Sequence, residues 1–132
     1  MKRILIVDDD VIIRITFEKL LKTGNYMIQQ AKDVGDALRL MRDHIFDLVL
    51  LDLKLPTKGW EGGFQILKKK RGIKLNMSTP VIIVSGAKDD DPIKKRLTTE
   101  DNVYDVLLKP VDNDVLMTKI AEALGQSPEM MP

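Results

Sequence analysis

Cysteine is absent from this sequence of 132 residues, which excludes disulfides, thiolate metal sites and cysteine nucleophiles and is compatible with a reducing compartment. Long hydrophobic runs are also lacking, so we expect no membrane-spanning helix. Charge of one sign is not in excess either, and the net charge of +1 favours neither nucleic acid nor an acidic membrane as a partner. Basic and apolar residues open the chain, but three aspartates follow Val7, which argues against a secretion signal. We therefore expect a cytoplasmic protein.

Five short apolar runs predict β-strands. Four of them are rich in β-branched residues and bounded by polar or turn residues, as in parallel strands buried on both faces. A weaker run follows the turn signal Gly24-Asn25 and predicts an edge strand. The four strong runs are residues 4–7, 48–51, 81–84 and 106–108 with Val103 just before it, and the weaker run is residues 26–31.

Between these runs, apolar residues recur with the spacing of amphipathic helices. The patterns are Ile13, Phe17, Leu20 and Leu21; Val34, Ala37, Leu38 and Met41, capped by Asp33; Phe64 and Leu67; a short polar helix over residues 93–98 after Pro92; and Leu116, Ile120, Ala123 and Leu124, ended by Gly125. Alternating strands and helices predict an α/β fold with a doubly wound parallel sheet. We expect one domain over residues 1–125 and a disordered tail over residues 126–132.

Polar side chains of related chemistry follow four of the predicted strands. They are Asp8, Asp9 and Asp10 after the first, Asp52 after the third, Ser85 at the fourth and Lys109 after the fifth. Open parallel sheets bind ligands at the carboxyl ends of their strands, so these groups are expected to meet. Clustered carboxylates repel one another unless a cation joins them, and oxygen ligands alone favour Mg²⁺. A carboxylate there can attack phosphorus, while the hydroxyl and the ammonium bind phosphoryl oxygens. A cis Lys109-Pro110 bond would aim the lysine at this edge.

Four segments resemble the receiver domain of two-component response regulators. They are residues 4–10 (ILIVDDD), 47–56 (DLVLLDLKLP), 80–86 (PVIIVSG) and 107–110 (LLKP). The similarity extends over nearly the whole chain, and the signature positions are filled in order. It implies a flavodoxin-like three-layer sandwich, in which five parallel strands in the order 2-1-3-4-5 are flanked by five helices.

The resemblance also implies a function. Asp52 would be the phosphoacceptor, taking its phosphoryl group from a phosphohistidine of a sensor histidine kinase. Ser85 would be the switch hydroxyl and Lys109 the salt-bridge lysine. Phosphorylation would change a surface read by a downstream output protein or a fused output domain. The chain would be no enzyme beyond its own phosphorylation and dephosphorylation, would bind no nucleic acid or membrane, and would be a monomer or weak homodimer.

A divalent cation, Mg²⁺ or Mn²⁺, is implied by the same resemblance. Asp8 and Asp9 would form the acid pair of the metal site. Asp9 and Asp52 would bind the ion alongside the backbone carbonyl of Lys54. Asp10 is a common third acid in such proteins and is usually no ligand.

The sequence departs from the family pattern at three places. Val106 stands three residues before Lys109, where the family usually has Tyr or Phe, and Tyr104 is two residues earlier. The loop over residues 55–63 is longer than usual by about three residues, and the stretch from Ser85 to Lys109 by about two. These departures concern the output of a signal more than phosphorylation.

Two other functions stay open on the sequence alone. A phosphatase of the haloacid dehalogenase type also places Asp-x-Asp after its first strand, and it would use Asp8 rather than Asp52 as nucleophile. A receiver-like interaction domain that is not phosphorylated in use is the other alternative, and Val106 favours it. The basic run over residues 68–71 predicts a solvated helix face rather than a nucleic-acid contact.

Overall fold

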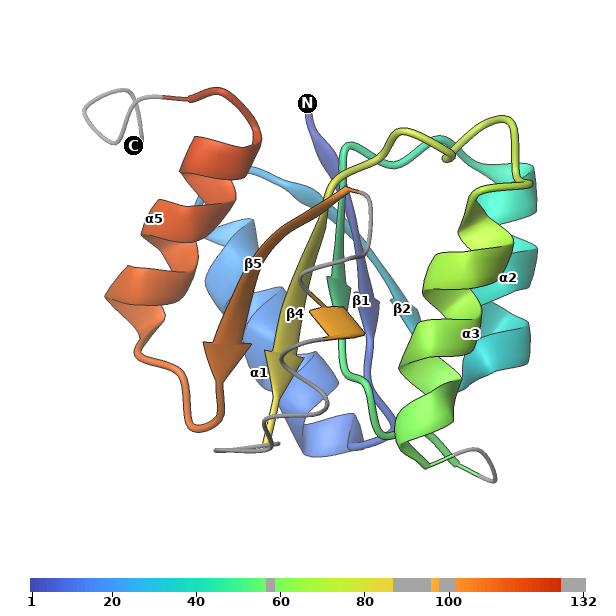
Figure 1. Ribbon diagram of the computed structural model, residues 1–132. Coiled ribbons are helices and arrows are strands. Elements are labelled where there is room, and N and C mark those ends of the chain that lie inside the picture. The colour runs from blue at the N-terminus through green and yellow to red at the C-terminus, as the bar shows by residue number, and fades with distance from the viewer. Residues whose placement is uncertain (57–58, 87–95, 98–101, 127–132) are drawn as a thin grey trace.

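The computed structural model describes residues 1–56, 59–86, 96–97 and 102–126 of the chain. Its elements are β1 (Arg3–Val7), α1 (Val11–Lys22), β2 (Met27–Ala31), α2 (Val34–Asp43), β3 (Leu48–Leu51), α3 (Trp60–Lys70), β4 (Val81–Ser85), β5 (Val103–Leu108) and α5 (Asn113–Ala123). All strand pairs are parallel, and the sheet order is β2-β1-β3-β4-β5. The predicted fold class and strand order are therefore confirmed (Figure 1).

Helices cover both faces of the sheet, with α1 and α5 on one side and α2 and α3 on the other (Figure 1). Successive side chains of a strand point to opposite faces. In β1, Leu5 and Val7 join the core under α2 and α3, whereas Ile4 and Ile6 join the core under α1 and α5. All four are at most 1% exposed, which explains why this strand is an unbroken apolar run.

Side-chain caps fix where three helices begin. Asp10 accepts hydrogen bonds from the Ile12 and Ile13 N–H groups, and the predicted cap Asp33 accepts one from Asp36 N–H. Asp112 caps α5 in the same way. Carboxylates at these positions satisfy amide donors that have no partner within the helix. Among the helices described, none is long and apolar enough to cross a membrane.

Helix α3 begins at Trp60, four residues before the apolar pattern predicts. The glycines that suggest a loop lie inside the helix, and Gly63 is there because the backbone beneath is close. A Cβ added to Gly63 would lie 2.5 Å from Leu53 Cα, and the Gly63 N–H donates to the Leu53 carbonyl at 2.8 Å. The glycine therefore lets α3 pack directly on the chain that leaves β3.

Two sequence predictions fall mostly on residues that the structure does not describe. Of the predicted helix over residues 93–98, only Arg96 and Leu97 are described, and both are helical. Of the predicted tail over residues 126–132, only Gln126 is described, and its side chain accepts a hydrogen bond from the Tyr26 hydroxyl at 2.8 Å.

A buried asparagine ties two loops together at the amino-terminal end of the sheet. Asn76 is fully buried; its Oδ1 accepts from Phe46 N–H at 2.8 Å and from the Thr79 hydroxyl at 3.0 Å. Its Nδ2 donates to the Met41 and His44 carbonyls, each at 2.6 Å. The partners lie in the last turn of α2, in the connection from α2 to β3 and in the connection from α3 to β4, so one side chain sets the spacing of these segments.

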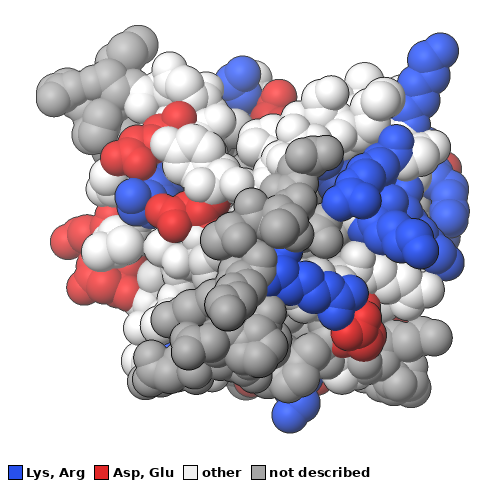
Figure 2. Space-filling view, in the orientation of Figure 1, with Lys and Arg blue, Asp and Glu red and all other residues white. Residues whose placement is uncertain are grey.

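The basic run at the end of α3 is only partly solvated, which corrects the sequence interpretation. Lys68, Lys69 and Arg71 are exposed, and Figure 2 shows lysine and arginine side chains gathered over this end of the helix. Lys70 is only 2% exposed, and its Nζ donates to the Met77 carbonyl at 3.4 Å. Burial lowers the pKa of Lys70 to about 8, and the nearby Arg71 charge adds to that shift. The helical period places this one lysine inward.

Candidate functional site

Neighbouring strands bring two of the predicted acids together. β1 and β3 pair with Val7 opposite Leu51, so Asp8 and Asp52 leave the sheet side by side. The Asp52 N–H continues the pairing by donating to the Val7 carbonyl at 2.9 Å. Both aspartates are buried, with 3% and 7% of their surface exposed. Their burial and proximity make this edge a place where negative charge needs a counter-charge.

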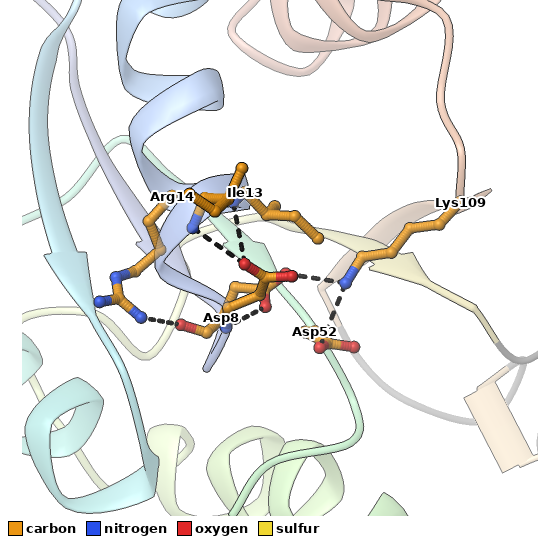
Figure 3. Close-up of polar contacts among 7 residues, drawn as sticks. Asp8, Ile13, Arg14, Asp52 and Lys109 are labelled. Atoms are coloured by element: carbon orange, nitrogen blue, oxygen red, sulfur yellow. Dashed lines mark hydrogen bonds and ion pairs between the residues drawn. The ribbon is translucent and has the colours of Figure 1, made fainter.

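Lys109, the residue directly after β5, supplies part of that counter-charge. Its Nζ lies 2.8 Å from Asp8 Oδ2 and 3.3 Å from Asp52 Oδ2, so it points between the two carboxylates (Figure 3). The Lys109 N–H donates to the Ser85 carbonyl at 2.9 Å, which fixes the backbone from which the side chain extends. The Lys109-Pro110 bond is cis, the isomer that the sequence left open.

Asp9 completes a group of three acids. Asp8, Asp9 and Asp52 each offer a carboxylate oxygen, and these atoms all lie within 4.8 Å of one another. Asp9 is exposed while its two companions are buried, so the group is open on one side. Three hard oxygen ligands on an open face fit Mg²⁺, which keeps several waters and takes few protein carboxylates. Asp10 is absent from this group because its side chain caps α1.

Arg14 holds Asp8 in place, and the sequence interpretation missed it. Its guanidinium donates to the Asp8 carbonyl at 2.7 Å (Figure 3). It also donates to Gln30 Oε1 at 3.0 Å. The Asp8 carboxylate in turn accepts the Asp10 N–H at 2.9 Å. Arg14 follows the aspartate triplet by one helical turn, and this spacing was the available signal.

A cavity of about 730 Å³ opens beside the acids. It is lined by Asp9, Asp52, Lys54, Leu55, Pro56, Gly59, Gly86 and Lys109. Asp52 borders this space and Asp8 is not among its lining residues. Of these two buried acids, Asp52 is the one that faces the cavity.

The electrostatics distinguish Asp52 from an ordinary aspartate. Burial raises the pKa of Asp52 from 3.8 to about 6, and the charge of Asp8 adds to the rise. Lys109 and a backbone hydrogen bond from Lys54 act in the opposite direction but do not cancel it. For Lys109, burial lowers the pKa, but hydrogen bonds and charges from Asp8 and Asp52 outweigh burial, so the pKa is raised overall. Near neutral pH, the Asp52 carboxylate and the Lys109 ammonium are therefore mostly charged.

We expect the Asp52→Asn variant, without metal, to be more stable than the parent at pH 7.5. An aspartate whose folded-state pKa is raised binds its proton more tightly in the folded state, so stability falls as pH rises from about 4 to 6. Asparagine does not titrate, so the variant avoids this loss. Its free energy of unfolding at pH 7.5 should exceed that of the parent by about 1–2 kcal/mol, a value that allows for solvent screening. Urea unfolding in EDTA should show the difference at pH 7.5 and its decline toward pH 4. An equal difference at both pH values would contradict the raised pKa.

The remaining predicted positions lie around the same edge. Ser85 ends β4 and is 1% exposed. Val106, at the position usually aromatic in similar proteins, is half-buried and packs against the core under α2 and α3. Tyr104 does not take over that position, because it is 46% exposed and its hydroxyl lies 3.5 Å from Glu122 of α5. Of the predicted site residues, the side chains of Asp8, Asp52 and Lys109 are thus in direct contact, and a carboxylate oxygen of Asp9 lies within 4.8 Å of the other two acids. Lys54 and Ser85 adjoin this group through backbone hydrogen bonds to Asp52 and Lys109.

Fold and site define a doubly wound α/β protein with an acidic, lysine-bridged pocket at the carboxyl ends of its strands. The model of the response regulator receiver domain matches residues 4–121, and the chain belongs to this family. It is therefore a phosphoacceptor domain of two-component signalling, and the predicted resemblance is confirmed. The haloacid dehalogenase phosphatases, the enzymatic alternative, are a different class.

Similar proteins include complete regulators and sensor kinases. The chain is 31% identical over 129 residues to the response regulator ArlR of Staphylococcus aureus, covering 98% of this chain and 55% of ArlR. It is 32% identical over 120 residues to the CAI-1 autoinducer sensor kinase/phosphatase CqsS of Vibrio cholerae, covering 91% of this chain and 17% of that protein. The chain thus spans about half or less of these curated relatives.

Solved structures agree with the fold. A CheY-like receiver domain protein from Methanospirillum hungatei is 31% identical, with a TM-score of 0.81 and coverage of 95% of this chain and 94% of the other. The receiver domain of the sensor histidine kinase PA1611 from Pseudomonas aeruginosa, solved with a magnesium ion in its active-site cleft, has a TM-score of 0.81 at 22% identity. That match covers 95% of this chain and 98% of the other.

Proposed function

We propose that Asp52 is the phosphoacceptor and that a sensor histidine kinase supplies its phosphoryl group in the presence of Mg²⁺. The observation that carries this proposal is the exposure of Asp52, rather than Asp8, to the cavity of about 730 Å³. Asp8 is further engaged, because its two carboxylate oxygens accept from the Asp10 N–H and the Lys109 ammonium. Asp52 contacts the Lys109 ammonium through Oδ2 at 3.3 Å, and its carboxylate is the proposed nucleophile.

Each residue of the pocket has a role in this proposal. The Asp52 carboxylate attacks phosphorus, and the leaving group departs on the opposite side, from the cavity. Lys109 neutralises a phosphoryl oxygen, and Ser85 donates a hydrogen bond to another. Asp8, positioned by Arg14, keeps Lys109 beside Asp52. Asp9, Asp52 and the Lys54 carbonyl, with Asp8 behind them, would hold Mg²⁺, which neutralises charge on the phosphoryl group.

The domain is inferred to support only its own phosphorylation and dephosphorylation. Its output would pass to a downstream protein or to a fused output domain, through the surface that includes β5 and α5. It would bind no nucleic acid or membrane, and it would act as a monomer or weak homodimer in the cytoplasm. The domain itself is proposed to end near Gly125, with the residues beyond it forming a tail.

Reductive trapping tests the assignment of the nucleophile. The protein is incubated with acetyl phosphate and Mg²⁺, and borohydride then reduces any aspartyl phosphate to homoserine. Peptide sequencing by mass spectrometry should find homoserine at position 52 and nowhere in a sample without acetyl phosphate. Homoserine at position 8 would support the phosphatase chemistry instead. No homoserine at any position would support the third alternative, a receiver-like interaction domain that is not phosphorylated in use.

We expect Mg²⁺ to stabilise the protein through Asp9. A ligand that binds only the folded state raises stability, by about 1–3 kcal/mol at saturating Mg²⁺. Asp9→Ala should lose most of this gain, yet be more stable than the parent without metal because repulsion between acids is relieved. Thermal unfolding with Mg²⁺ and with EDTA measures both effects.

Asp43→Ala is the matched control, because Asp43 is an exposed aspartate at the end of α2, outside the acidic group. It should keep the full response to Mg²⁺. An equal Mg²⁺ response in the Asp9→Ala protein would show that the ion binds elsewhere.

A further inference from the structure

A second groove lies along β2, away from the acidic pocket. It has a volume of about 450 Å³. It is lined by Arg3, Lys22, Tyr26, Met27, Ile28, Gln29 and His44. Four consecutive lining residues lead into and along β2, and β2 ends the sheet order, with β1 as its strand partner among the described residues. Figure 1 shows this strand at the rim of the sheet. An edge strand presents backbone N–H and C=O groups to any extended chain that lies beside it.

Basic residues line the groove. Arg3, Lys22 and His44 come from β1, α1 and the end of α2, and no acid is among the lining residues in the described part of the chain. Arg3 Nη1 lies 3.5 Å from His44 Nδ1, so these two basic side chains gather at one place. Lys22 pairs with Glu18 one helical turn away at 3.8 Å, and the lysine side chain is 62% exposed, so this pair holds the lysine only weakly.

The groove also offers apolar surface. Met27 is 45% exposed at the start of β2, and the Tyr26 ring beside it is buried. Met27 is the register partner of Arg3, so an apolar and a basic side chain lie on the same face of this edge, where an added strand would meet both. Extended peptides bind sheet edges in this way, with main-chain hydrogen bonds giving affinity and side-chain pockets giving selectivity.

We propose that the groove beside β2 binds an extended, acidic segment of a partner protein as an added β-strand. The basic residues of the lining select acidic side chains, and the edge of β2 that faces away from β1 selects an extended backbone. The site lies at the amino-terminal half of β2, whereas the acids lie beyond the carboxyl ends of β1 and β3. Binding here leaves the phosphorylation pocket open, so one domain can be tethered and phosphorylated at once.

The test is an NMR titration of the whole chain with a capped hexapeptide of alternating valine and glutamate. Amide signals of residues 26–31 should move and saturate. The Lys22→Glu variant should weaken binding about fivefold or more, as expected for one ion pair replaced by repulsion. Lys68→Glu, the same charge change on the exposed end of α3, should leave the affinity unchanged. A hexapeptide N-methylated at alternate residues, which cannot donate along a strand edge, should not bind.

Four results would overturn the proposal. The first is no saturable shift at millimolar peptide, and the second is shifts centred on residues 68–71. Equal binding of the N-methylated peptide would show attraction by charge alone. Shifts at residues 26–31 that depend on protein concentration without peptide would assign the edge to a second copy of this chain. Unaltered phosphorylation of Lys22→Glu by acetyl phosphate is the control that this variant remains folded.

Discussion

The Asp52→Asn protein is expected to take up no phosphoryl group from acetyl phosphate, whereas the parent protein takes up one. Asparagine has nearly the same shape as aspartate but no nucleophilic carboxylate, so the chemistry is lost while the fold is kept. Intact-mass spectrometry after incubation with acetyl phosphate and Mg²⁺ measures this directly. The expected effect is the complete loss of the adduct, the largest that any single substitution in the pocket should cause.

The matched control is Asp8→Asn, because Asp8 lies beside Asp52 and contacts the same lysine. It should slow phosphorylation through weaker metal binding and a displaced Lys109, but an adduct should still form. A persistent adduct on Asp52→Asn, together with none on Asp8→Asn, would exchange the roles of the two aspartates. Continued release of phosphate by Asp52→Asn would point to the phosphatase chemistry.

The Asn76→Ala protein is expected to be destabilised by at least about 3 kcal/mol, which lowers the melting temperature by roughly 10 °C. The substitution leaves the Phe46 N–H and the Met41 and His44 carbonyls without the amide that bonds them. These groups surround a fully buried side chain, so the polar atoms lose their partner where water enters poorly. Chemical denaturation at pH 7 gives the change in the free energy of unfolding.

Asn113→Ala provides the same chemical change at an exposed position, the first residue of α5. Its effect should stay within about 0.5 kcal/mol, as is usual for surface substitutions. If both variants lost equal stability, the contacts of Asn76 would contribute nothing beyond the general cost of replacing asparagine. Acetyl phosphate labelling of Asn76→Ala should persist below its melting temperature, since the network lies at the other end of the sheet.

The sheet and the main site residues could be predicted because both depend on short-range patterns. An apolar run buried on both faces, as in residues 4–7, is visible without knowing what packs on it. The rule that ligands bind at the carboxyl ends of parallel strands then placed Asp8, Asp52 and Lys109 together. The contacts among these three residues are consistent with that reasoning.

The features that the sequence did not reveal depend on contacts between distant segments. Gly63 resembles a loop residue until the position of Leu53 beneath it is known. Lys70 is indistinguishable in sequence from its exposed neighbours, because all four residues of the run are basic and residue type does not show which side chain points inward. Asn76 has four partners from three sequence regions, and its residue type alone suggests a turn. The same holds for Arg14, because its role in positioning Asp8 follows from a contact with the Asp8 carbonyl that the sequence does not show.

The burial of β1 on both faces makes the unfolding of the two helical layers cooperative. Because its side chains alternate between the two cores, both helical layers pack against this one strand. Loosening either layer removes support from the strand and thereby from the opposite layer. The two layers are therefore not independent folding units. Release of one pair of helices exposes one face of β1 to water, and the same strand supports the helices on the other face. No partly folded state with only one helical layer in place should therefore be stable. The pocket is kept while both layers are packed on the sheet, and it is lost when they unfold together.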